Sequence, residues 1–251
     1  MDFLRLEKLT KRFGGLEAVG ELTIAFKRGH ITGLIGPNGA GKTTVVNMIT
    51  GIIVPTNGDI WLGARSLTRI QPYEAARLGI ARTFQNVRLL TEASVLDNIV
   101  IGFHRHQKSS LLANSIGLPA VWREKRDFRA RAHALIERFG MSELADRAAG
   151  ALSYGHRRLV EVIRALALAP SFLLLDEPCA GMNDVESRNL GLIIRELAKE
   201  GVGIVLVEHN MRFVMEFCEH IFVVDSGRLI AEGAPQAVRN DANVIRAYLG
   251  N

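Results

Sequence analysis

Residues 36–43 read Gly-Pro-Asn-Gly-Ala-Gly-Lys-Thr and follow the apolar run Ile31–Ile35. They match the pattern G-x-x-x-x-G-K-[ST], in which glycines let backbone N–H groups wrap around phosphate oxygens at the positive end of a helix. Lys42 would bring a mobile charge to the terminal phosphates, and the Thr43 hydroxyl a ligand for Mg²⁺. The stretch therefore predicts a nucleoside triphosphate site after a buried strand. The residues expected to bind phosphate are Asn38, Gly39, Gly41, Lys42, Thr43 and Thr44.

A second signal is the run Phe172–Glu177, which is typical of a buried strand ending in two adjacent carboxylates. Successive strand residues point to opposite sides, so Asp176 and Glu177 are expected to have different roles. Asp176 is suited to hold Mg²⁺ through water, and Glu177 to polarise the water that attacks the γ-phosphorus. Beside residues 36–43, this pair predicts hydrolysis of the bound nucleotide.

Outside these motifs, the patterning predicts an α/β fold with a mostly parallel core sheet. Strand-like runs occur at Leu4–Leu9, Ile31–Ile35, Phe172–Leu175 and Ile204–Val207, and helical periodicity covers 185–199. An Asn-Gly turn before Trp61 and a hairpin pattern over 223–230 add antiparallel strands. The core is expected to comprise residues 1–85 and 164–251, with an antiparallel β subdomain.

Residues 86–163 are predicted to form an inserted helical lobe. An apolar stripe runs from Phe128 to Phe139 at helical spacing, and a basic cluster over 123–131 lies largely off that stripe. Glu124 and Asp127 interrupt the cluster, and no aromatic residues interleave with it, so a solvated helix face is favoured over a nucleic-acid patch.

Composition sets outer bounds on function. The chain has 251 residues, a formal net charge of +5, 48% hydrophobic and 23% charged residues, as in an ordinary globular protein. No apolar stretch approaches the roughly 20 residues of a spanning helix, and the N-terminus lacks a secretory pattern, so we expect a cytoplasmic protein. Cys179 and Cys218 are expected to be buried, reduced thiols. The mild positive charge suits nucleic acid, an anionic membrane or a phosphate ligand equally well.

The stretch Leu152–Arg158 reads Leu-Ser-Tyr-Gly-His-Arg-Arg just before a predicted helix. Its order relative to the two carboxylates and the loop 36–43 resembles the signature motif of ATP-binding-cassette (ABC) ATPases, the motor subunits of ABC transporters. The resemblance implies a P-loop NTPase (RecA-like) fold. It also implies that Ser153 and the Gly155 amide cap the γ-phosphate of an ATP held by a partner cassette.

Further matches extend the resemblance over the whole chain. Gln85 matches the family's glutamine that senses Mg²⁺ and the membrane partner, and His209 matches the switch histidine at the γ-phosphate. Phe13 resembles the aromatic residue that stacks on adenine, and Val19 is expected to pack against the same base. The implied catalytic residues are Glu177, His209 and Gln85, and the implied metal ligands are Thr43, Gln85 and Asp176.

One branch of the family fits best. Five stretches resemble the LivG-type ATPases of bacterial branched-chain amino acid importers: residues 83–86, 152–155, 180–183, 207–211 and 247–250. Of these, residues 180–183 match the D-loop, a stretch that touches the partner's site in this family. The chain departs from the common ABC patterns at three positions: Tyr154 replaces glycine, His156 replaces glutamine or glutamate, and Asn183 replaces aspartate.

The resemblance implies an ATP- and Mg²⁺-dependent motor on the cytoplasmic face of the inner membrane. Its implied partners are a second ABC ATPase in a head-to-tail dimer, two transmembrane permease subunits and, through them, a substrate-binding protein, with no nucleic acid. Whether the second cassette is a copy or a sister subunit stays open. Two alternatives also remain: an importer of urea, amides or organic acids, and a soluble ABC ATPase acting on nucleic acid or ribosomes. The single set of motifs weighs against the latter.

Overall fold

The computed structural model describes residues 3–83, 88–106 and 119–249. The chain divides into two compact units, one formed by residues 1–85 and 171–251 and the other by residues 86–170. The second boundary falls at 170, later than the expected 163, because helix α6 (Tyr154–Leu166) belongs to the second unit. Each unit is described by itself.

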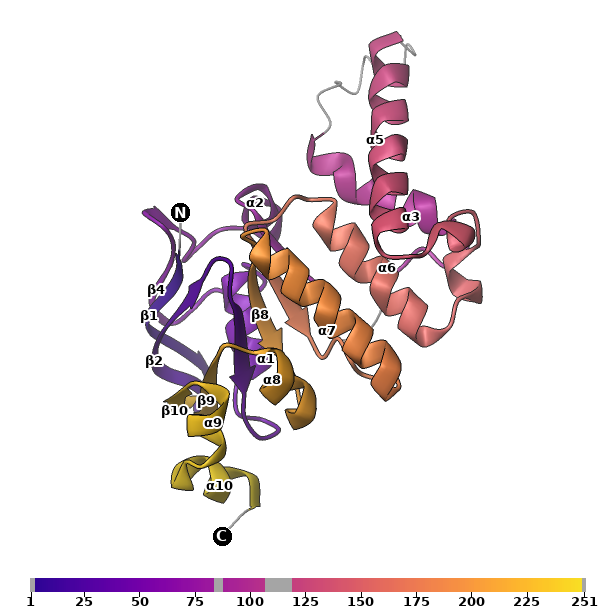
Figure 1. The fold of residues 1–251 in the computed structure, drawn as a ribbon. Helices are drawn as coiled ribbons and strands as arrows, with labels where there is room; N and C mark the ends of the chain where they lie inside the picture. The colour runs from indigo at the N-terminus through magenta and orange to yellow at the C-terminus, as the bar shows by residue number, and fades with distance from the viewer. Residues whose placement is uncertain (1–2, 84–87, 107–118, 250–251) are drawn as a thin grey trace. The chain divides into compact units, whose positions relative to one another are not determined.

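The described part of the first unit contains two sheets (Figure 1). The larger is parallel except for its edge strand β10, which pairs antiparallel with β9. In spatial order its strands are β10 (Arg228–Gly233), β9 (His220–Asp225), β3 (Ile31–Ile35), β8 (Gly203–Val207), β7 (Phe172–Asp176) and β6 (Ile80–Arg82). The smaller, antiparallel sheet has the order β2 (Leu16–Lys27), β1 (Phe3–Phe13), β4 (Asn57–Leu62) and β5 (Arg65–Ser66). The predicted α/β fold, with its antiparallel part, is confirmed.

The core of this unit lies around the three central strands. Every residue of β3, β7 and β8 is buried, as expected of parallel strands covered on both faces. Because these strands are parallel, the loops that follow them emerge at one edge of the sheet. The loop at residues 36–43, called the phosphate loop below, therefore comes to the same edge of the sheet as the carboxylates of Asp176 and Glu177. The segment that begins at Glu208 also lies at this edge.

In the described residues of the first unit, six helices accompany the sheets. They are α1 (Lys42–Ile49), α2 (Pro72–Arg77), α7 (Asp184–Lys199), α8 (Met211–Phe217), α9 (Pro235–Arg239) and α10 (Ala242–Leu249). Helix α7 begins with a capping box, in which Asn183 Oδ1 accepts from Glu186 N at 2.9 Å and the Glu186 carboxylate accepts from Asn183 N at 3.0 Å. Its buried face carries the predicted apolar stripe, including Leu190 and Ile194.

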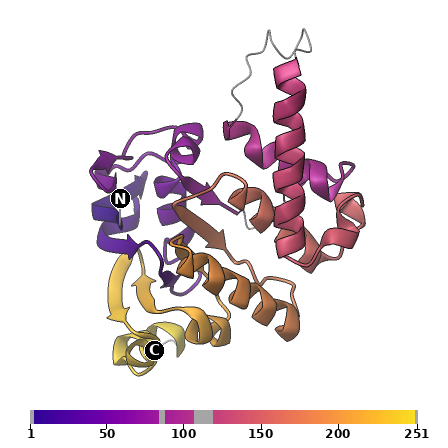
Figure 2. The same ribbon diagram turned by 45° about the horizontal axis from the view of Figure 1, so that its top comes forward.

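The second unit is helical, as its periodicity predicts. It contains α3 (Val95–Gly102), α5 (Pro119–Arg138), α6 and short 3-10 turns at Phe103–His106, Ser142–Leu144 and Ala149–Ala151. Both views show α5 as one long straight helix with α3 beside it (Figure 2). Phe128 of α5 stacks on Phe103 with ring centroids 5.6 Å apart, and the basic residues of α5 are exposed. Within the described ranges, no helix combines the length and apolar character needed to cross a membrane.

Candidate functional site

The loop between β3 and α1 needs glycine at two positions. Gly36 and Gly41 have φ angles of 151° and 96°, which residues with side chains rarely adopt. A Cβ atom on Gly36 would lie 1.9 Å from the Val224 carbonyl oxygen, and one on Gly41 would lie 2.4 Å from that of Ala18. The loop therefore owes its curvature and its close approach to neighbouring backbone to these glycines.

The start of α1 gathers positive charge inside that loop. Gly41 caps the helix without a side-chain hydrogen bond. The Lys42 ammonium donates to the carbonyl oxygens of Gly36 at 2.7 Å and Pro37 at 2.8 Å. Burial lowers the pKa of Lys42 below its ordinary value, and the carboxylates of Glu177 and Asp176 oppose that shift. An ammonium beside a helix N-terminus favours an anion such as phosphate.

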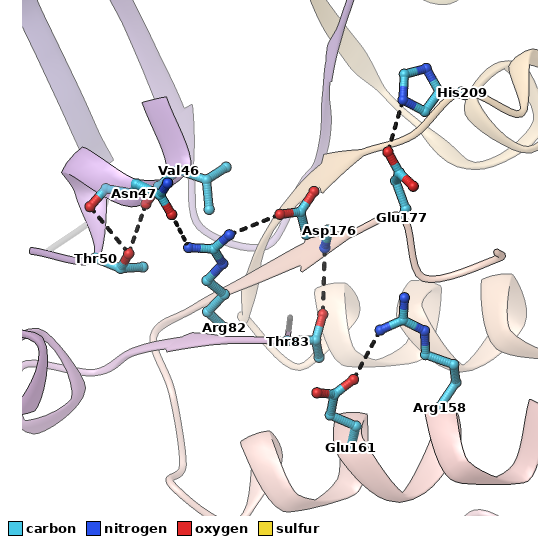
Figure 3. Close-up of polar contacts among 10 residues, drawn as sticks. All are labelled: Val46, Asn47, Thr50, Arg82, Thr83, Arg158, Glu161, Asp176, Glu177 and His209. Atoms are coloured by element: carbon cyan, nitrogen blue, oxygen red, sulfur yellow. Dashed lines mark hydrogen bonds and ion pairs between the residues drawn. The ribbon is translucent and has the colours of Figure 1, made fainter. Parts of the chain in front are cut away.

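Asp176, which ends β7, is held through both its carboxylate and its backbone N–H. Asp176 is 2% exposed, and its Oδ2 pairs with Arg82 Nη2 at 2.9 Å. Arg82 also donates to Asn47 Oδ1 of α1 (Figure 3). The backbone N–H of Asp176 donates to Thr83 Oγ1 at 3.4 Å. Arg82 thus links β6, β7 and α1 next to the phosphate loop.

Glu177 points toward a histidine in the segment that follows the neighbouring strand β8. Its φ angle of 49° is in the left-handed region, and its N–H donates to the carbonyl oxygen of Val207 at 2.8 Å. The Oε1 atom lies 2.9 Å from Nε2 of His209, as Figure 3 shows. Both side chains are partly exposed, at 22% for Glu177 and 41% for His209. A solvent-accessible carboxylate oriented by an imidazole is suited to accept a proton from water.

A cleft of about 290 Å³ is lined both by the loop 36–43 with the start of α1 and by the Glu177–His209 pair. Its lining consists of Ala18, Asn38, Gly39, Ala40, Gly41, Lys42, Thr43, Thr44, Glu177, Val207 and His209. All six residues expected to bind phosphate are therefore on its wall, together with two of the three expected catalytic residues. The third, Gln85, lies outside the described residues.

Two oxygen-bearing side chains at this edge of the sheet suit Mg²⁺. Thr43 is exposed on the first turn of α1, and Asp176 is a carboxylate at the end of β7. Hydroxyl and carboxylate oxygens are the hard ligands that Mg²⁺ takes beside phosphate oxygens and water. Of the two carboxylate oxygens of Asp176, only Oδ2 accepts a hydrogen bond from a side chain within the described ranges. The residues present therefore fit a nucleotide-bound Mg²⁺.

The two residues expected at the adenine differ in their environment. Phe13 is 47% exposed, so a base can reach its ring, and Lys11 Nζ lies over one ring face, 5.1 Å from the centroid. Val19 is fully buried in the hydrophobic core, whereas its neighbour Ala18 lines the cleft. The resemblance implied Val19 at the base, but successive strand residues point to opposite faces, and Ala18 is the residue that lines the cleft.

In the second unit, the signature stretch begins α6. Ser153 is the N-cap of this helix, and its Oγ accepts from His156 N at 3.3 Å. The same oxygen lies 3.0 Å from Nδ1 of His156. Ser153 and His156 are exposed, while Gly155 is buried within the first turn. The His156 side chain, which departs from the family pattern, thus contacts the serine directly.

The backbone of Arg88 is hydrogen-bonded to side chains of α6, and an ion pair within α6 holds one of these side chains. Arg158 Nη1 and Glu161 Oε2 are 3.0 Å apart, with side chains 1% and 2% exposed (Figure 3). Glu161 Oε1 also accepts from Arg88 N at 3.4 Å, and Arg164 donates to the Arg88 carbonyl oxygen at 2.7 Å. The position of residue 88 is therefore tied to the signature helix.

Three polar side chains that lie at the first unit's site were not predicted from the sequence: Asn47, Arg82 and Glu208. Arg82 and Glu208 each follow a short apolar strand pattern, and both are largely buried. A charge that closes a buried run needs a partner, so this placement is the signal that could have found them. Asn47 carries no such signal, because a polar residue on a helix is ordinary.

Comparison with known proteins gives consistent matches along the chain. Residues 19–180 match the ABC transporter family, and residues 228–251 match the branched-chain amino acid ATP-binding cassette transporter family. The "High-affinity branched-chain amino acid transport ATP-binding protein BraF" of Pseudomonas aeruginosa is 40% identical, over 98% of this chain and 97% of that protein. The protein LivG of Salmonella typhimurium, with the same description, is 42% identical over the same shares.

Solved structures agree with the fold. A nucleotide-free ATP-binding cassette from an ABC transporter superposes with a TM-score of 0.88 at 33% identity, over 100% of both chains. The ADP conformation of MJ1267, an ATP-binding cassette of an ABC transporter, superposes with a TM-score of 0.87, also at 33% identity and full coverage of both chains.

Proposed function

This chain belongs to the ABC transporter family of ATP-binding cassettes, and we propose that it is the ATP-hydrolysing subunit of an importer of branched-chain amino acids. The observation that carries the ATPase assignment is the cleft that joins the phosphate loop to the Glu177–His209 pair. The cargo rests on the relatives BraF and LivG, which are named as branched-chain amino acid transport proteins.

Residues of the cleft and residues outside its lining have separate proposed roles in hydrolysis. Lys42 and the amides at the start of α1 bind the phosphates, and Phe13 stacks on the base. Mg²⁺, when bound, neutralises phosphate charge; Thr43 and Asp176 would hold it, with Gln85 as the third expected ligand. Glu177 accepts a proton from water while the water oxygen bonds to the γ-phosphorus and the bond to the ADP oxygen breaks. His209 orients Glu177 through their 2.9 Å contact.

The exposed Ser153 on α6 is proposed to serve a neighbouring cassette. In a head-to-tail dimer, Ser153 and the Gly155 amide of one cassette cap the γ-phosphate held by the other. The dimer then closes when these contacts to the γ-phosphate form, and it opens when hydrolysis removes them. Residues 86–163 and Gln85 pass this movement to two transmembrane permease subunits, which receive cargo from a substrate-binding protein. The chain works peripherally, on the cytoplasmic face of the inner membrane, with Mg²⁺-ATP and without nucleic acid.

Glu177→Gln tests the proposal because it removes the proton acceptor and leaves the phosphate loop intact. The tagged variant is expressed in its native cell, membranes are solubilised gently in ATP, and co-purifying proteins are identified. We expect two multispanning proteins, a second cassette and an amino-acid-binding protein, with greater recovery than for wild type. Glu232→Gln, on an exposed carboxylate of β10, is the control. Rapid ATP turnover by Glu177→Gln would refute the catalytic assignment, and recovery with ribosomes or DNA alone would refute transport.

A further inference from the structure

One carboxylate that is not among the predicted site residues connects two loops of the candidate site. Glu208 directly follows β8 and is 3% exposed. Its Oε1 accepts from the backbone N–H of Cys179 at 2.8 Å. Its Oε2 accepts from the backbone N–H groups of His209 at 2.9 Å and Asn210 at 3.2 Å. The two oxygens thus serve segments that follow two different strands.

Burying an ionised carboxylate is costly unless its oxygens are hydrogen-bonded. Three backbone donors satisfy Glu208, and among the described residues it forms no ion pair. An acceptor-only group with two oxygens can accept hydrogen bonds from both segments at once, which an apolar residue cannot do. Glu208 therefore joins the segment at residue 179 to the segment at residues 209 and 210, in addition to the bond from Glu177 N to the Val207 carbonyl oxygen.

Both segments lead directly to functional groups. The Cys179 carbonyl oxygen accepts from Met182 N at 3.1 Å, and the Glu177 carbonyl oxygen accepts from Ala180 N at 3.2 Å, so residues 177–182 form one tight turn. On the other side, Glu208 precedes His209, whose ring contacts the Glu177 carboxylate. Glu208 thus closes a ring of hydrogen bonds that runs through the turn, Glu177 and His209.

We propose that Glu208 is a positioning residue that couples His209 to the segment 179–183. It acts through two groups: the imidazole that orients Glu177, and the turn that leads to Asn183 at the start of α7. A shift of His209 on gain or loss of γ-phosphate contacts is passed by the Glu208 carboxylate to this turn. The inference rests on the proposed ATPase function, and it adds a link between the catalytic pair and the segment expected to face the partner cassette.

Glu208→Gln is the first test because the amide keeps the shape of the carboxylate. It replaces one acceptor oxygen by an NH₂ group, which then faces a backbone N–H donor. In the full chain with Mg²⁺-ATP, we expect kcat to fall about 10- to 100-fold, the effect of a misplaced catalytic group, while KM for ATP changes little. The control is Glu219→Gln, since Glu219 accepts from Ile31 N and pairs with His30 at the other end of β3.

A double variant separates coupling from general damage. If Glu208 acts through His209, single-turnover hydrolysis by Glu208→Gln/His209→Ala is no slower than by His209→Ala alone. If Glu208 only supports the fold, the two losses multiply, and the coupling is refuted.

Hydrogen exchange gives a readout that does not depend on turnover. We expect Glu208→Gln to speed amide exchange in residues 179–183 and in 209–210 together, and Glu219→Gln to leave both segments unchanged. Faster exchange in only one segment, or evenly across the chain, refutes the coupling. Wild-type protein that fails to hydrolyse ATP would overturn the proposed function, whereas the exchange pattern would still decide the role of Glu208.

Discussion

The ion pair between Arg82 and Asp176 predicts a large loss of stability when the arginine is removed. The two side chains are 8% and 3% exposed, and the charged atoms are 2.9 Å apart. Arg82→Met keeps much of the side-chain volume but leaves the Asp176 carboxylate buried without its partner. Breaking a buried pair in this way costs about 3–5 kcal/mol. We expect a value near the lower limit, because the Lys42 ammonium still interacts with Asp176.

The free energy of unfolding is measured by urea titration, followed by circular dichroism, for Arg82→Met and for a matched control. Arg131→Met removes an exposed i,i+4 pair with Asp127, whose side chains are 57% and 51% exposed, and should cost about 0.3–0.5 kcal/mol. Adding Asp176→Asn to Arg82→Met removes the unpaired charge and should recover part of the loss. The reasoning is refuted if Arg82→Met costs no more than Arg131→Met, or if the double variant is no more stable than Arg82→Met.

Three further outcomes are expected. Gly36→Ala should lower the midpoint of thermal unfolding far more than Gly39→Ala, because both positions have positive φ but only at Gly36 would the Cβ meet backbone, at 1.9 Å from the Val224 oxygen. Lys42→Met should weaken ADP binding, measured by calorimetry, about 10- to 100-fold, the value of a charge-assisted hydrogen bond; unchanged affinity would contradict its role. Burial raises the pKa of Cys218 from 9.0 to about 12, so the native state holds this proton more tightly than the unfolded state. The stabilisation that this protonated thiol gives the native state is complete below pH 9 and declines above it. Between pH 8 and pH 10, the free energy of unfolding should therefore fall by about 1.4 kcal/mol more for the wild type than for Cys218→Ala in urea titrations, and equal losses would contradict this.

Features that depend on neighbours along the chain were predictable from the sequence. The spacing of Gly36, Gly41 and Lys42 indicated the phosphate loop, because a loop between a strand and a helix is shaped by its own residues. The run that ends in Asp176 and Glu177 indicated a buried strand, and the apolar spacing over 185–199 indicated the helix observed as α7. Even the exposure of the basic face of α5 followed from local periodicity.

Features that depend on which strands lie side by side were decided by the tertiary structure. Arg82 meets Asp176, 94 residues away, because β6 pairs with β7. Glu208 reaches Cys179 because β8 is the next strand on the other side of β7. Hydrophobic periodicity specifies which face of a strand is buried, but it carries no information about the neighbouring strand. The sequence by itself therefore determined which phosphate-loop and carboxylate residues are available to the cleft, and the order of the strands decided which other side chains hold them in place.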